Sequence, residues 1–178
     1  MVKVFLVEDE AIIRHGIRDN IDWASHGFEF AGEAGDGEYA YPLILKAQPD
    51  ILVTDIKMPF MDGLELSRLV KKTLPRTRII VLSGYNEFEY AKEAIKMDAA
   101  EYLLKPVNAG ELKEVFERIK ADLDRERDEK RNTDKLRGYY MESLPVLQES
   151  FYMALLEGRV AARQIGKYAK DYQVNLSA

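Results

Sequence analysis

Cysteine is absent from the 178-residue sequence, and histidine occurs only twice. The absence of cysteine excludes disulfides, a thiol nucleophile and cysteine-based metal sites, and it fits a reducing compartment. His15 and His26 lack a second ligand at metal spacing, so we interpret both as ordinary surface or helix residues. A surplus of basic residues is also missing, because the net charge is −5. This balance argues against a chain that binds nucleic acid as a whole.

Long hydrophobic runs are missing as well. No apolar stretch approaches the ~20 residues of a membrane span. The N-terminal run Val2–Val7 reads as a strand and is not followed by the cleavage site of a signal peptide. The hydrophobic share of 47% and the charged share of 32% are those of an ordinary globular protein. We therefore predict a cytoplasmic protein without a membrane partner.

Short apolar runs alternate with helical patterns over roughly the first two thirds of the chain. The predicted strands are residues 4–7, 28–34, 51–55, 79–82 and 101–104. A helical pattern follows each strand, and Asp62 is placed to cap the third helix. In the fourth helix, residues 87–97, we expect Phe88, Ala91, Ala94 and Ile95 to face inward. Five alternating strand–helix units predict an α/β fold with a doubly wound parallel sheet.

The character of the sequence changes near residue 122. Residues 122–137 are dense in charge, with opposite signs four residues apart, as in Arg125 and Glu129. We interpret them as a solvated helical extension or linker, because the apolar positions of a coiled coil do not continue. Gly138 and Pro145 are expected to bracket a break, after which apolar residues return at helical spacing. The predicted domains are residues 1–123, a charged helical linker at 124–142, and the start of an incomplete helical domain at 143–178.

Charged and polar residues stand where the predicted strands end. Glu8 and Asp9 follow the first strand, Asp55 ends the third, Ser83 ends the fourth, and Lys105 follows the fifth. The carboxyl ends of parallel strands share one edge, where ligands gather. Carboxylates crowded there repel each other unless a cation lies among them, and oxygen ligands suit Mg²⁺. A carboxylate can also act as a nucleophile and form an acyl phosphate.

These motifs, in this order and spacing, resemble the receiver domain of two-component response regulators. The resemblance covers residues 2–123 and is carried by Glu8-Asp9, Asp55, Met58-Pro59, Asp62-Gly63, Ser83-Gly84 and Tyr102-Leu103-Leu104-Lys105-Pro106. It implies a flavodoxin-like, five-stranded sheet in the order 2-1-3-4-5.

The resemblance also implies a role for each residue of the set. Asp55 would be the phosphoacceptor, and Mg²⁺ would be held by Glu8, Asp9, Asp55 and the backbone carbonyl of Lys57. Ser83 and Lys105 would bind the phosphoryl oxygens, with Ser83 and Tyr102 as switch residues and Lys105-Pro106 as a cis peptide bond. The chain would assist its own phosphorylation and dephosphorylation without being a conventional enzyme. Position 8 is Glu where the family often has Asp, which leaves direct or water-mediated metal contact open.

The remainder is similar to regulators that join a receiver to an AraC-type DNA-binding domain, the YesN-like group. Trp23 and the stretches 83–91 and 151–158 carry this similarity. It implies a sensor histidine kinase as partner, a possible homodimer on phosphorylation, and DNA binding only through a C-terminal domain. No helix-turn-helix pair is present in the sequence, so we expect a chain truncated before that domain.

Other interpretations stay open at this point. Asp55 could be the nucleophile of a phosphohydrolase, but Lys57 stands where such enzymes carry a second Asp as general acid. The chain could also be an interaction module that is never phosphorylated. Tyr102 is as consistent with a packed aromatic as with a switch, and Glu8-Asp9 could serve as an ordinary first helical turn.

Overall fold

The computed structural model describes residues 1–84 and 88–176, with the backbone alone at residue 88. The chain divides into two compact units, Met1–Asp122 and Leu123–Ala178. We call them unit 1 and unit 2 and describe each by itself.

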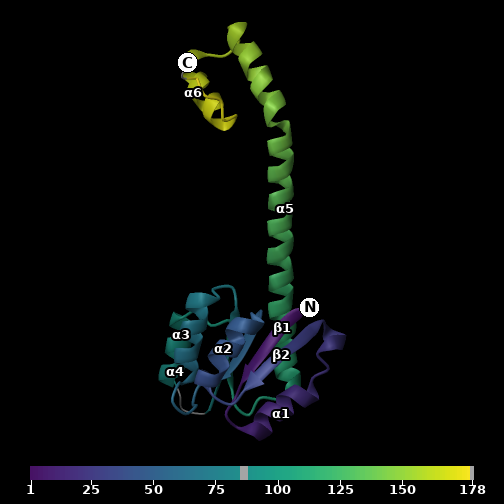
Figure 1. Cartoon of the computed structure of the whole chain (residues 1–178), viewed down its shortest axis with the longest axis vertical. Helices are drawn as coiled ribbons and strands as arrows, with labels where there is room; N and C mark the ends of the chain where they lie inside the picture. The colour runs from purple at the N-terminus through teal and green to yellow at the C-terminus, as the bar shows by residue number, and fades with distance from the viewer. Residues whose placement is uncertain (85–87, 177–178) are drawn as a thin grey trace. The chain divides into compact units, whose positions relative to one another are not determined.

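Unit 1 is built on a five-stranded parallel sheet (Figure 1). The strands are β1 (Val2–Val7), β2 (Phe28–Ala34), β3 (Ile51–Asp55), β4 (Arg78–Ser83) and β5 (Glu101–Leu104). They pair in the order β2-β1-β3-β4-β5, which confirms the expected sheet. Every residue of the central strand β3 is buried, as expected when helices cover both faces of a parallel sheet.

Helices cover the two faces of the sheet. They are α1 (Ala11–Asn20), α2 (Gly37–Ala47), α3 (Gly63–Thr73), α4 (Phe88–Lys96) and the first turns of α5 (Ala109–Leu156), with a short 3-10 turn η1 (Ala24–His26). Helices α2, α3 and α4 lie together on one side of the sheet (Figure 1). They bury Ile44, Leu66 and Ala94 in one core cluster with strand residues. On the other face, the ring of Phe116 in α5 lies 5.7 Å from the ring of Phe28.

Asp62 caps α3 as predicted. Its Oδ1 accepts hydrogen bonds from the backbone N–H groups of Leu64 and Glu65, both at 2.8 Å. A short side chain that accepts from the first turn satisfies N–H groups that have no partner inside the helix. The cap thereby sets where α3 begins, directly after the loop that leaves β3.

The predicted inward face of α4 was partly wrong. Ala94 is buried, but Ile95 is 76% exposed, and Tyr90 and Met97 pack against the core instead. The reason is angular, because adjacent residues of a helix point about 100° apart, whereas positions three and four apart share a face. Residue 87, where this helix was expected to begin, and the side chain of Phe88 lie outside what the structure describes.

In unit 2, the predicted break at Gly138 and Pro145 was wrong. Helix α5 runs without interruption to Leu156, with Pro145 inside it, and α6 (Ala162–Asp171) follows. A proline inside a helix removes one backbone hydrogen bond, and packing around it can compensate for the loss. Here the neighbouring Leu144 and the more distant Phe151 are both buried.

An aromatic cluster joins α6 to the end of α5. The ring of Phe151 lies 6.2 Å from that of Tyr168 and 6.0 Å from that of Tyr172. Gln148 donates from Nε2 to the carbonyl of Tyr172 at 2.9 Å, and the Tyr140 hydroxyl donates to the carbonyl of Asp171. Unit 2 is therefore a helical pair with a small core of its own.

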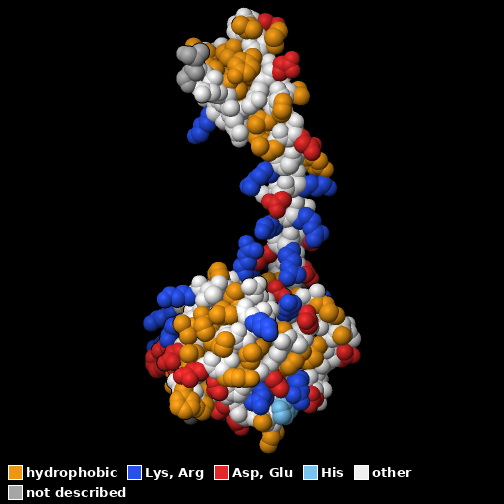
Figure 2. Space-filling view, viewed as in Figure 1, with side chains coloured by type: hydrophobic (Ala, Val, Ile, Leu, Met, Phe, Trp, Pro, Cys, Tyr) orange, Lys and Arg blue, Asp and Glu red, His pale blue; other side chains and the backbone are white. Residues whose placement is uncertain are grey.

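The part of α5 at residues 124–137 carries many charged side chains. Residues 124–137 are all exposed, and Figure 2 shows acidic and basic side chains interspersed along this part of α5. Among the residues that the structure describes, no helix is long and apolar enough to cross a membrane.

Candidate functional site

The strand register brings the predicted site residues to one edge of unit 1. Val7 pairs with Thr54, so Glu8 follows β1 beside Asp55 at the end of β3. Leu82 pairs with Asp55, and Ser83 pairs with Leu104, which places Ser83 and Lys105 at the same edge. Four strand ends therefore deliver their polar side chains to a common place.

Lys105 lies at the centre of this group. Its Nζ is 2.9 Å from Oε2 of Glu8 and 3.0 Å from Oδ2 of Asp55. Glu10 approaches the same ammonium more loosely, at 4.0 Å from its Oε1. The Lys105-Pro106 peptide bond is cis, as predicted. One ammonium thus bridges the acidic ends of two neighbouring strands.

Backbone groups of neighbouring residues fix the position of Asp55. It is 5% exposed, and its Oδ1 accepts a hydrogen bond from the backbone N–H of Ile56 at 2.9 Å. Gly63 passes so close that a Cβ there would lie 1.8 Å from the Asp55 carbonyl oxygen. Only glycine permits this approach, so the start of α3 and the end of β3 depend on each other.

Burial dominates the protonation of the two deepest acids. Burial raises the pKa of Glu8 to about 7, with the charge of Asp55 adding to the rise and Lys105 opposing it. Burial likewise raises the pKa of Asp55, with Lys105 opposing and the carboxylate of Asp9 adding to the rise. For Lys105, burial lowers the pKa, but the ion pairs with Glu8 and Asp55 outweigh it and the net shift is upward. An additional cation at this edge would therefore stabilise the ionised form of both acids.

The donor set fits a hard divalent cation. Carboxylate oxygens of Glu8, Asp9 and Glu10 all lie within 4.8 Å of one another, and Glu8 is fully buried. Asp55 adds a fourth carboxylate to this edge, and the ammonium of Lys105 contacts Glu8 and Asp55. Oxygen ligands of this kind, with room for water, match the preference of Mg²⁺.

The structure also describes the three remaining predicted residues, Ser83, Tyr102 and Lys57. Ser83 is fully buried, and its hydroxyl donates to the Gly84 carbonyl at 3.3 Å. Tyr102 pairs in register with Val81, inside the sheet, and packs half-buried against the core. Lys57 follows Asp55 in the loop after β3 with its side chain exposed.

A groove opens beside this edge. It has a volume of about 890 Å³, lies between α1 and the loop after β5, and is lined by Glu10 and Lys105 among others. The acidic edge is therefore accessible from this side.

Sequence reasoning missed two participants. Glu10 belongs to the acidic group, and the unbroken run Glu8-Asp9-Glu10 was the available signal. Arg14 donates from Nη1 to the carbonyl oxygen of Glu8 at 2.6 Å. No local pattern marks such a contact, since it depends on how α1 packs beside β1.

Comparisons with known proteins agree with this architecture. The sequence profile of the response regulator receiver domain matches residues 4–117. The transcriptional regulatory protein YesN of Bacillus subtilis (strain 168) is 45% identical over 137 residues, covering 77% of this chain and 37% of YesN. HptR of Staphylococcus aureus (strain N315) is 38% identical over 119 residues, covering 67% of this chain and 46% of HptR. The chain thus spans a third to a half of these relatives.

Solved structures give the same picture. The receiver (REC) domain of AraT, a response regulator from Geobacillus stearothermophilus, has a TM-score of 0.67 and 46% identity, covering 71% of this chain and 99% of that one. A two-component transcriptional regulator AraC from Clostridium phytofermentans has a TM-score of 0.62 and 36% identity, covering 67% and 92%. Both alignments leave out roughly a third of this chain.

Proposed function

We propose that Asp55 accepts a phosphoryl group from a sensor histidine kinase, because this chain belongs to the response regulator receiver domain family. One observation carries the proposal. The Asp55 carboxylate lies at the carboxyl edge of the sheet with Oδ1 held by Ile56 and Oδ2 3.0 Å from Lys105. A nucleophile is thereby oriented next to a positive charge that can meet the incoming phosphoryl oxygens.

The transfer exchanges one bond for another. The P–N bond of a phosphohistidine breaks while a P–O bond forms at Oδ2 of Asp55, and the product is an acyl phosphate. Phosphoryl transfer needs positioning and charge neutralisation more than acid–base chemistry. Lys105 supplies a point charge for the phosphoryl oxygens, and Ser83 supplies a hydroxyl donor from the neighbouring strand.

We assign the metal site to Glu8, Asp9, Asp55 and the backbone carbonyl of Lys57. Mg²⁺, when bound, would neutralise the phosphoryl charge. The burial of the Glu8 carboxyl group and the crowding of carboxylates at this edge support the assignment. Lys105, which now bridges Glu8 and Asp55, would then share its role as counter-charge with the metal.

The phosphoryl group would act as a switch. It adds a charge of about −1.5 to −2, and we propose that Ser83 moves toward it while Tyr102 changes its packing. The change would reach a DNA-binding domain in a longer protein and, through it, transcription. The names of the similar proteins, transcriptional regulators about two to three times longer than the match, support this output.

A phosphohydrolase is less well supported. Phosphohydrolases of the haloacid-dehalogenase class carry a second Asp two residues after the nucleophile as general acid, and here that position is Lys57. The side chain of Lys57 is exposed.

The test is phosphorylation by acetyl phosphate with Mg²⁺, followed by intact mass. Wild type should gain one phosphoryl group, Asp55→Asn should gain none, and Asp128→Asn, an exposed acid on α5, should behave as wild type. Equal gain in Asp55→Asn would refute the assignment of the phosphoacceptor. Many turnovers on small phosphate esters would instead favour the phosphohydrolase.

A further inference from the structure

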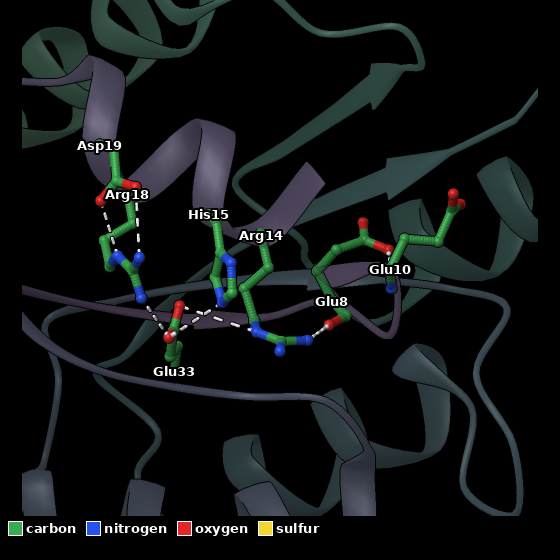
Figure 3. Close-up of polar contacts among 7 residues, drawn as sticks. All are labelled: Glu8, Glu10, Arg14, His15, Arg18, Asp19 and Glu33. Atoms are coloured by element: carbon green, nitrogen blue, oxygen red, sulfur yellow. Dashed lines mark hydrogen bonds and ion pairs between the residues drawn. The ribbon is translucent and has the colours of Figure 1, made fainter. Parts of the chain in front are cut away.

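Arg14 holds the backbone of the acidic loop from the side. Its Nη1 donates to the carbonyl oxygen of Glu8 at 2.6 Å, and its side chain is only 17% exposed (Figure 3). On the opposite side of the same residue, the N–H of Glu8 donates to the carbonyl of Ala34 at 3.1 Å. Both backbone polar groups of Glu8 are therefore engaged, one by β2 and one by α1.

Glu33 fixes the guanidinium in turn. This residue of β2 has Oε2 at 3.7 Å from Nε of Arg14 and Oε1 at 2.8 Å from Nη1 of Arg18. His15 approaches the same carboxylate, with Nε2 at 3.9 Å from Oε1. Figure 3 shows Arg14 lying between Glu33 and the Glu8 backbone. Glu33 is three-quarters buried, so these contacts are only partly screened by solvent.

The chain leaves room for this guanidinium. Gly35 follows β2, and a Cβ at that position would lie 3.3 Å from Nη1 of Arg14. That distance is tighter than most side-chain contacts, so a larger residue would push against the group that binds Glu8. Glu33 of β2 and the turn at Gly35 thus both border the guanidinium that holds the Glu8 carbonyl oxygen.

Holding this carbonyl has a consequence for the next residue. A peptide unit is planar, so the Glu8 carbonyl and the Asp9 N–H turn together. A guanidinium bound to the oxygen therefore sets the direction in which Asp9 leaves the strand. The Glu8 side chain has a separate restraint, because its Oε1 accepts from the Glu10 N–H at 3.1 Å.

We propose that Arg14, braced by Glu33, is a positioning residue that presents Glu8 and Asp9 to the divalent cation. The inference rests on the proposed function, because it concerns the same metal site. It assigns Arg14 no contact with the metal or the phosphoryl group. Its action is geometric, through the Glu8–Asp9 peptide.

Charge and geometry predict opposite outcomes, which makes the proposal testable. Arg14 is a cation near a cation site, so removing its charge alone should strengthen Mg²⁺ binding. Losing its positioning role should weaken binding, and groups that orient metal ligands typically change affinity by roughly 10–100-fold. Arg18→Gln is the matched control, because it removes the same charge from the same helix and the same Glu33 partner without touching Glu8.

The experiment is an NMR titration of Mg²⁺ into the full chain, following the amides of Glu8, Asp9 and Glu10. The rate of acetyl phosphate uptake is measured in parallel as a function of Mg²⁺. Arg14→Gln should raise the Mg²⁺ dissociation constant at least roughly tenfold, with a much smaller change in the rate at saturating Mg²⁺. Arg18→Gln should leave the constant unchanged or lower it.

Two further variants keep the test decisive if Arg14→Gln does not fold. Glu33→Gln loosens the brace, and Gly35→Ala crowds the guanidinium, so each should weaken Mg²⁺ binding to a lesser degree. Equal constants for wild type and the folded brace variants would overturn the inference. If wild type takes up a phosphoryl group and the variants bind Mg²⁺ as tightly as wild type, the positioning role of Arg14 is refuted and the proposed function stands. A wild type that binds no Mg²⁺ would refute the metal site and the brace together.

Discussion

The two units of this chain carry similar kinds of residues and use them in opposite ways. Unit 1 buries Glu8 and Asp55 around Lys105, whereas the charged side chains of residues 124–137 in unit 2 are exposed. Exposed ion pairs contribute at most about 1 kcal/mol each to folding stability, because water and salt screen their charges. A dense run of charge therefore indicates a solvated surface, and it becomes a site only where the fold removes it from water.

The aromatic residues of the two units also differ in how deeply they are buried. In unit 1, Phe116 is fully buried between Phe28 and Trp23. In unit 2, Phe151 is nearly buried, but its neighbour Tyr152 is 47% exposed and the cluster rests on a single helical pair. Trp23 is the only tryptophan of the chain, so its fluorescence reports unit 1 and far-ultraviolet circular dichroism reports both units.

The largest expected effect on unit 1 is that of Phe116→Ala. Removing a fully buried ring leaves a cavity and should lower the free energy of unfolding by about 3–5 kcal/mol. Urea unfolding followed by Trp23 fluorescence measures it. Phe60→Ala is the control, because this side chain is 91% exposed and its loss should change little. A shift of similar size in both variants would contradict the burial that distinguishes the core of unit 1.

A smaller effect follows from the raised pKa of Glu8. The folded state holds a proton with a pKa of about 7, against an ordinary value of 4.5, so stability is gained at low pH and lost as pH rises through about 7. Without metal, unit 1 should lose about 1 kcal/mol of unfolding free energy between about pH 6 and about pH 8.

Trp23-monitored unfolding in a chelator measures this dependence at several pH values. Glu8→Gln should flatten it, and saturating Mg²⁺ should reduce it because the metal favours the ionised carboxylate. Glu129→Gln, in the exposed stretch of α5, should leave it as in wild type. If the slope persists in Glu8→Gln, another group carries it.

The smallest expected effect on unit 1 is that of Phe151→Ala. The substitution removes the ring that contacts Tyr168 and Tyr172, so helical signal in unit 2 should fall. The Trp23 transition should shift by less than about 0.5 kcal/mol, as expected for sites without shared partners. A larger shift in that transition would show that the two units unfold together.

Much of unit 1 was predictable because its signals are local. Apolar runs of four to seven residues with turn residues between them predicted all five strands, and Asp62 was correctly placed as a cap. The inward face of α4 was misjudged at Ile95, where a step of four residues from Tyr90 and a further step of three would have found Ala94 and Met97. In unit 2, the helix through Pro145 was missed, since a local breaker was weighed without the packing around it.

The sequence by itself determined the order of the elements and which polar residues stand at strand ends, because both follow from patterns a few residues long. It placed Glu8, Asp55, Ser83 and Lys105 at one edge, and their roles in phosphoryl transfer stay predictions. Only the tertiary structure decided that Lys105 bridges Glu8 and Asp55 and that Arg14 and Glu33 hold the Glu8 peptide. Those contacts join residues from different elements, and their distances depend on how helices pack against the sheet, which no local pattern records.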